Sequence, residues 1–146
     1  MKPAMLTAHF SFDELTACPH HTDLQDKNRL EAAAFEDKLR EVCGLLELLR
    51  AKFGPITVTS GYRCPALNAA VGGVPDSQHA KAEAADIVPQ RAALDEVFTW
   101  ARKNLPQFGQ LIREPGWIHI SLGQPYRPAD KCRAALIFDG KTYRNA

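Results

Sequence analysis

The sequence has no excess of charge of either sign, because 18 lysines and arginines stand against 17 aspartates and glutamates in 146 residues. Nucleic-acid-binding domains usually carry a strong basic excess or a basic stripe, so the composition gives no support to that class of partner. The sequence also lacks any apolar run near the roughly 18–20 residues that span a membrane. Because 45% of the residues are hydrophobic, the chain can still build a packed core. We therefore expect a soluble protein with no nucleic-acid partner and no membrane span.

The sequence also lacks two signals that would place it in an oxidising compartment. The first ten residues contain no apolar stretch typical of a secretory signal peptide, so we expect synthesis in the cytoplasm without an export signal. The four cysteines form no C-x-x-C pair, and disulfides follow oxidising compartments, so we expect reduced thiols.

There is no internal repeat, and the length is close to the ~100–150 residues of one domain. We predict a single domain over residues 1–146, present as a monomer.

Hydrophobic periodicity predicts helices mostly in the first part of the chain and strands mostly in the last. One long helix is expected over residues 26–53, after a turn-rich segment at 10–24, and shorter helices at 65–71 and 92–103. Alternating or β-branched segments predict strands at 56–60, 84–88, 108–113 and 117–122, and a terminal hairpin of 134–138 with 141–144. This order predicts an α+β fold, with an antiparallel sheet and helices packed on one of its sides.

Three residues of this predicted sheet and its loops could form a metal site. Alternate residues of a strand share a face, so His119 would lie opposite the apolar Ile118 and Ile120, on an accessible face. Asp86 lies within strand 84–88, and His79 lies in the loop before it. If the two strands are neighbours, the three polar side chains converge. Two imidazoles and one carboxylate suit a catalytic zinc, because three protein ligands leave a fourth position open for water. The alternative is a loop histidine, a capping aspartate and a half-buried strand histidine with no shared ligand.

Longer motifs contain the same residues. Ser60-Gly61-Tyr62-Arg63 precedes Ser77-x-His79, which leads to Asp86, and Trp117-Ile118-His119 follows. This series resembles the pattern S-G-Y-R, S-x-H-x-x-G-x-A-x-D and a tryptophan-flanked histidine of the D-alanyl-D-alanine and L-alanyl-D-glutamate zinc metallopeptidases. The likeness is to their short phage-type branch, which is related to the hedgehog zinc fold, and it spans nearly the whole chain. The glycine of that pattern is Ala82 here, and alanine would tolerate the loop poorly if its φ is positive.

The resemblance implies a role for five residues. His79, Asp86 and His119 would bind Zn²⁺. Hydrolysis of an amide needs a base and an acid, and Glu114 stands where the family has a residue that moves protons, shortly before the last zinc ligand. Arg63 would contact a substrate carbonyl or carboxylate, where a guanidinium stabilises negative charge. The alternatives are a solvated turn carboxylate for Glu114 and a surface arginine for Arg63. A rival base, Glu83, is expected to point outward.

Other side chains near these motifs allow two interpretations. Ser77 could donate a hydrogen bond to the substrate or cap the local turn. Trp117 could form a wall of the substrate cleft or simply pack against the strand. Cys64 could approach the metal, but a fourth protein ligand would close the water position, so we expect a zinc site without it. Three histidines match no ligand position of the family and are expected at the surface: His9, His20 and His21.

The function implied by the resemblance is that of a zinc-dependent peptidoglycan peptidase, which hydrolyses a stem-peptide amide with a water activated by zinc. The D,D-carboxypeptidase and L-Ala-D-Glu endopeptidase types both remain open, because loops around the cleft decide between them. Such a protein would act on the bacterial cell wall, and a phage-encoded endolysin would fit. The alternative is a non-catalytic, zinc-containing phage structural or wall-binding module of the same fold. A third hypothesis is a metal-free protein in which the spacing is coincidental.

Overall fold

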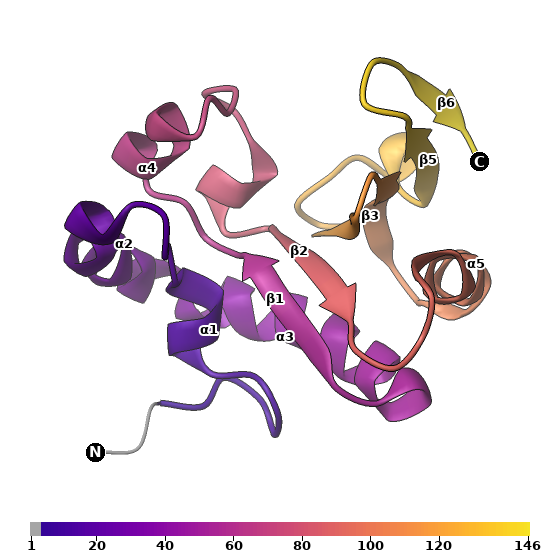
Figure 1. Cartoon of the computed structure of the whole chain (residues 1–146), viewed down its shortest axis with the longest axis horizontal. Coiled ribbons are helices and arrows are strands. Elements are labelled where there is room, and N and C mark those ends of the chain that lie inside the picture. Colours follow the sequence, from indigo (N-terminus) through magenta and orange to yellow (C-terminus); the bar gives the residue numbers. More distant parts are fainter. Residues whose placement is uncertain (1–3) are drawn as a thin grey trace.

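A six-stranded sheet forms the centre of the molecule in the computed structural model, which describes residues 4–146 (Figure 1). The first three residues, part of the stretch compared with signal peptides, lie outside it. The strand order is β1-β2-β4-β3-β5-β6. The strands are β1 Ile56–Ser60, β2 Ala84–Pro89, β3 Phe108–Glu114, β4 Trp117–Leu122, β5 Ala134–Phe138 and β6 Tyr143–Asn145. Each strand predicted from the sequence is therefore present, and the α+β class is confirmed.

One strand pair departs from the predicted antiparallel sheet. The pairs β1–β2, β2–β4, β3–β4 and β5–β6 are antiparallel, whereas β3 and β5 run parallel. The chain leaves β4 at Leu122, which lies opposite Phe108 at the start of β3, and β5 begins at Ala134, opposite Gln110. The connection thus passes around one end of β3 to its other side. A strand that starts there must run in the direction of β3, so the sheet is mixed and mostly antiparallel.

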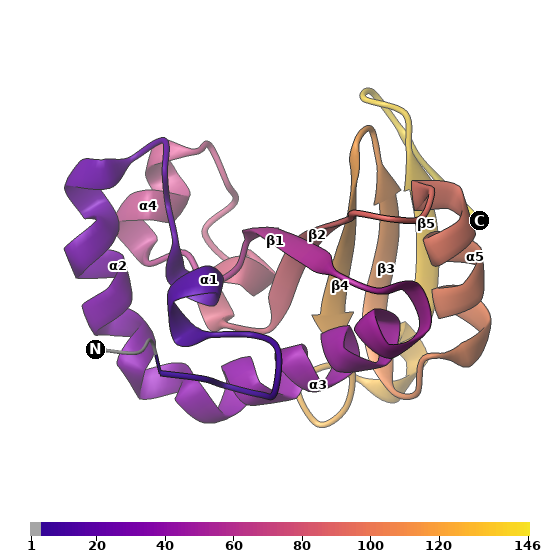
Figure 2. The same cartoon turned by 60° about the horizontal axis from the view of Figure 1, so that its bottom comes forward.

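Two helices cover the apolar face of the sheet. Helix α3 (Glu36–Phe53) runs across β1, β2 and β4, and α5 (Leu94–Asn104) packs on β3 and its neighbours (Figure 2). Their buried side chains meet the inward residues of the central strands, among them Ile87, Ile118 and Ile120. The smaller helices α1 (Phe12–Thr16), α2 (Gln25–Ala32) and α4 (Pro65–Ala70) gather beyond the β1 side of the sheet (Figure 1). The face opposite α3 and α5 is left for the polar residues of β2 and β4.

The long helix expected over 26–53 is wrong in one respect, because a 3₁₀ turn at Ala33–Phe35 divides it into α2 and α3. Phe35 has φ −116° and ψ 19°, outside helical geometry, and the acidic Glu36 and Asp37 favour a new helix N-terminus after it. Leu30, part of the apolar pattern, is 77% exposed. Helix α3 ends at Phe53, and the next residue, Gly54, has a φ of 82° that suits a glycine.

The segment expected to be turn-rich contains helix α1. Ser11 caps it: its side chain accepts a hydrogen bond from the Glu14 backbone, and the Glu14 side chain accepts one from the Ser11 backbone. This reciprocal pair satisfies two N–H groups that a short helix would otherwise leave free. Within the described residues, no helix has both the length and the apolar character required to cross a membrane.

Candidate metal centre and its cleft

Asp86 and His119 meet because they are direct partners in the antiparallel pair β2–β4. The Oδ1 atom of Asp86 lies 3.0 Å from Nδ1 of His119 and 3.2 Å from Nε2 of His79, which belongs to the 3₁₀ turn Gln78–Lys81. One candidate ligand atom from each residue lies within 4.8 Å of the other two. The predicted convergence of the three side chains on the accessible face is therefore confirmed.

The hydrogen bonds of the two histidines show that this group suits a cation. Nδ1 of His79 lies 2.8 Å from the carbonyl oxygen of Gly61, which can only accept, so this nitrogen carries the proton. In the neutral ring, Nε2 then turns a lone pair toward Oδ1 of Asp86. Because this nitrogen and this carboxylate oxygen are both electron donors, their close contact needs a proton or a metal ion between them. Nε2 of His119 lies 3.1 Å from the side-chain oxygen of Gln78. Two imidazoles with one carboxylate match the three-ligand sets that hold zinc, so the residues present fit that metal.

Asp86 is held in its ionised form. Burial of the carboxyl group acts to raise its pKa, but the charge of His79 and hydrogen bonds with both histidines outweigh burial, so the pKa lies well below the ordinary range. The carboxylate is therefore already deprotonated at neutral pH, which is the form in which it can serve as a metal ligand.

Gly61 supplies the acceptor that orients His79, and close packing explains why this position is glycine. A Cβ atom there would lie 2.3 Å from the carbonyl oxygen of Leu15 in helix α1. The neighbouring Tyr62 N–H donates to the same oxygen at 2.8 Å. Asn28 of α2 reinforces the contact, since its amide donates to the Tyr62 carbonyl and its oxygen accepts from the Cys64 N–H. The N-terminal helices thus fix the segment that holds a metal ligand in place.

The turn that carries His79 is fixed at both ends. Ser77 caps its start by accepting a hydrogen bond from the His79 N–H at 3.2 Å, which confirms the capping interpretation. Ala82 ends the turn with φ 59° and ψ 32°, in the left-handed region. This is the conformation in which glycine is favoured, so the structure explains why alanine is the unusual residue here.

A cleft of about 700 Å³ opens over the three candidate ligands. Glu114, Trp117, Ser77 and Arg63 line it together with them. Glu114 is only 8% exposed and is not a solvated turn carboxylate; its burial, with a smaller contribution from the charge of Asp86, raises the pKa of its carboxyl group. The cleft thus combines a cation site with a carboxyl group of raised pKa.

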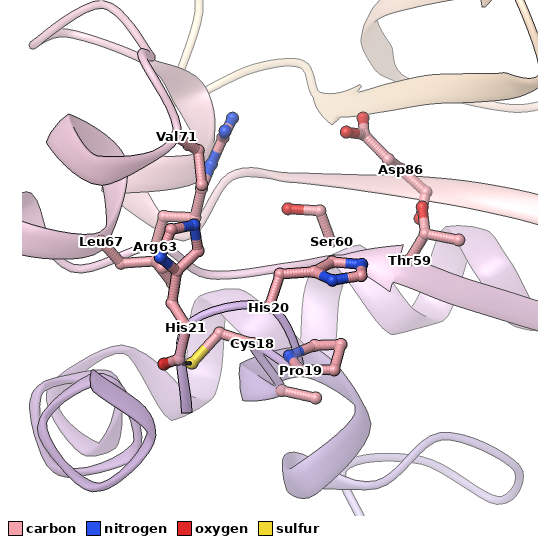
Figure 3. A pocket seen from close by; sticks show the side chains of 11 residues that line it. Cys18, Pro19, His20, His21, Thr59, Ser60, Arg63, Leu67, Val71 and Asp86 are labelled. Atoms are coloured by element: carbon pink, nitrogen blue, oxygen red, sulfur yellow. Dashed lines mark hydrogen bonds between the residues drawn. The ribbon is translucent and has the colours of Figure 1, made fainter. Parts of the chain in front are cut away.

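Arg63 lies between this cleft and a smaller pocket (Figure 3). It is half-buried and not a surface arginine, and its Nε atom is shielded from solvent without an acceptor among the described residues. Burial lowers the pKa of the guanidinium, and the charge of Asp86 opposes that change. A guanidinium has no acceptor of its own and needs an anion or carbonyl oxygen to satisfy its N–H groups.

The remaining expectations meet different outcomes. Glu83 is buried, against the expectation that it points outward: its carboxylate pairs with Lys38 of α3 at 2.7 Å, on the side away from the candidate ligands. This ion pair leaves Glu114, and not Glu83, as the glutamate that lines the cleft. Cys64 is buried and free, as are Cys18 and Cys43, while Cys132 is partly exposed. The candidate metal-binding group found among the described residues does not include Cys64.

Sequence reasoning missed several residues around the site. Gln78, the partner of His119, carries no signal beyond its position beside His79. Phe138 and Tyr143 of the terminal hairpin stack with ring centroids 4.4 Å apart and line the cleft, although they lie far along the chain. His20 and His21, expected as plain surface residues, line the pocket next to Arg63. Only the packing of α1 against β1 could have placed these two near the site.

The fold and the donor set define an α+β domain with a cleft and a candidate metal site, and comparison with known families identifies the class. A family model described as Peptidase M15 matches residues 8–121 of the 146. The chain therefore belongs to the peptidase M15 family, whose members are zinc enzymes. The matched span contains all three candidate ligands, Arg63 and Glu114, and it ends before β5 and β6. A comparison with curated proteins found no significant match.

Proposed function

We propose that this protein is a zinc-dependent peptidoglycan peptidase that hydrolyses an amide of the stem peptide. The observation that carries the proposal is the arrangement of His79, Asp86 and His119 beside Glu114 in one cleft of a peptidase-family chain. Each residue has a role that this chemistry needs, and the roles of Arg63, Ser77 and Trp117 are proposed with it.

The metal would be held by the two histidines and Asp86, with Gly61 fixing the ring of His79. Zinc, when bound, supplies Lewis acidity and lowers the pKa of a bound water to about 7. Glu114 accepts a proton from the attacking water and delivers it to the nitrogen of the leaving amine. Its raised pKa suits both steps, because an acid–base group works best when its pKa lies near the working pH.

Substrate contacts are assigned to three further residues. The guanidinium of Arg63 donates to the oxygen on which negative charge develops, or to a substrate carboxylate. Ser77 keeps a free hydroxyl proton while its oxygen caps the turn, so it can donate to the substrate. Trp117 forms a wall of the cleft. The scissile bond is D-Ala-D-Ala or L-Ala-D-Glu, and the place of action is the cell wall, reached by a phage-encoded protein.

Digestion of purified peptidoglycan, with products identified by mass, tests this proposal. We expect stem-peptide fragments that disappear with a chelator and return when zinc is added. Glu114→Gln should keep its zinc and lose roughly 10²–10⁴-fold in rate, whereas Glu96→Gln, on the exposed side of α5, should behave as wild type. A full rate in Glu114→Gln would show that the base is misassigned. Zinc binding without any hydrolysis by the wild-type protein would favour the non-catalytic wall-binding module.

A further inference from the structure

A second pocket, of about 360 Å³, adjoins the candidate metal centre. It shares Arg63, Val71 and Asp86 with the main cleft, so the two spaces meet at the metal-binding group. Its walls come from α4, the end of β1 and the loop that follows α1 (Figure 3). In this view His20 lies beside Ser60, while the ring of His21 reaches toward Arg63 and Leu67. A peptide bound across the candidate metal centre would therefore have the residues on one side of its scissile bond in the main cleft and those on the other side in this pocket.

The polar groups of this pocket are arranged for an anion. Arg63, His20 and His21 all present N–H donors, while Asp86 is the only carboxylate among the lining residues and its Oδ1 already faces the two metal-site histidines. Arg63 lines this pocket as well as the main cleft, and a carboxylate binds a guanidinium with two parallel hydrogen bonds. A metal ion on Asp86 would neutralise its charge and leave Arg63 still more in need of an anion.

We propose that this pocket binds a carboxylate carried by the residue on the amine side of the scissile bond, with His20 and His21 as specificity-determining residues. The inference rests on the proposed function and names the part of the substrate that is recognised. Both candidate bonds supply the group: D-Ala-D-Ala has a terminal carboxylate on its leaving residue. D-Glu, linked onward through its side chain, keeps a free α-carboxylate. The residue directly on the acyl side of either bond, D-Ala or L-Ala, has no free carboxylate.

Paired peptides that differ only in this carboxylate test the proposal. One pair is a stem peptide with D-Glu or its α-amide, D-isoglutamine, at the L-Ala-D-Glu bond. The other ends in D-Ala-D-Ala with a free or an amidated C-terminus. We expect the zinc-loaded protein to prefer the acid form of one pair by at least roughly tenfold in kcat/KM, equivalent to about 1.4 kcal/mol. The pair that shows the preference identifies the source of the carboxylate. Cleavage of acid and amide at equal rates in both pairs would overturn the pocket assignment and leave the peptidase function intact.

Variants of the loop provide the second measurement. His20 is exposed and its side chain makes no hydrogen bond within the described residues, so His20→Glu should fold normally and repel the bound carboxylate. We expect KM for the acid peptide to rise about tenfold with little change for the amide. Thr57→Glu adds the same charge to an exposed position of β1 outside both spaces and should leave the acid preference unchanged. An equal change in the two variants would contradict the proposal.

A binding measurement separates failure of this inference from failure of the proposed function. The imidazole proton resonances of His20 and His21 in the full-length zinc-loaded protein are followed while N-acetyl-D-alanine or its amide is added. We expect the acid to shift both resonances and the amide to leave them in place. No shift with the acid would overturn the pocket assignment whether or not peptides are cleaved. A shift without cleavage of any peptide would keep the pocket and refute the hydrolytic function.

Discussion

Replacing Ala82 with glycine should cost almost no stability, although the same change at another buried alanine should be destabilising. Ala82 is fully buried and has φ 59°, in the left-handed region. Ala85 is equally buried but lies in the extended strand β2, so the two positions differ mainly in backbone conformation. A comparison of Ala82→Gly with Ala85→Gly therefore isolates the cost of holding an alanine at positive φ.

The expected magnitudes follow from three contributions. Loss of a buried methyl group costs about 0.8 kcal/mol, and the greater freedom of glycine in the unfolded chain costs about 0.4–1 kcal/mol. Ala85→Gly should therefore lower the free energy of unfolding by about 1–2 kcal/mol. At Ala82 both costs apply, but glycine also removes the strain of a left-handed alanine, about 1–2 kcal/mol. The relief of strain nearly cancels the sum of the two costs, so Ala82→Gly should leave the free energy of unfolding almost unchanged.

Urea denaturation of the metal-free protein measures both values under one condition, followed by far-ultraviolet circular dichroism. The slopes of the two transitions should match that of the wild type, so that the midpoints report stability alone. Ala85→Gly should unfold at clearly lower urea than Ala82→Gly. If the two variants lose the same stability, the turn after His79 relaxes without cost and the strain argument is refuted.

Three further outcomes are expected. Gly61→Ala should destabilise the protein by about 1–3 kcal/mol, because its Cβ would press on the Leu15 carbonyl oxygen, and should weaken zinc affinity; unchanged urea and zinc titrations would contradict this. Under native conditions a thiol reagent should modify Cys132 first and Cys43 only after unfolding, since burial raises the pKa of Cys43 to about 12; rapid labelling of Cys43 would show that the core opens. Zinc at a hundredfold excess over its Kd should add about 2.7 kcal/mol of stability, and this gain should vanish in His119→Ala; equal melting with zinc and with chelator would exclude a site at this position.

Alternation along two strands predicted where the side chains of the candidate site lie, on the condition that the strands were neighbours, and the resemblance supplied their role as metal ligands. The apolar Ile118 and Ile120 had to face the core, which placed His119 on the open face, and Asp86 followed if β2 and β4 were neighbours. His79 required only a loop that returns to the start of β2. These inferences succeed because a strand has two faces and only one of them can be buried.

Features that depend on distant partners could not be predicted in this way. Glu83 has the sequence environment of an exposed residue, and only Lys38, 45 positions away, makes its burial possible. The direction of β5 depends on the path of the chain that connects it to β4 around the end of β3, and no local sequence pattern predicts that path. The break at Ala33–Phe35 has only a weak local signal, the acidic Glu36 and Asp37 after it, while the alanines by themselves favour an unbroken helix.

The direct pairing of Asp86 with His119 limits how this chain can change in length. A strand has a side-chain period of two, so inserting or deleting one residue on either side of this pair would turn a candidate ligand toward α3 and an isoleucine into the cleft. The connection between β4 and β5 has no such constraint, since it must only pass around the end of β3. Length variation among natural relatives should therefore gather in that connection and avoid β2 and β4. An alignment of such relatives should therefore contain no gaps within the two segments that correspond to β2 and β4.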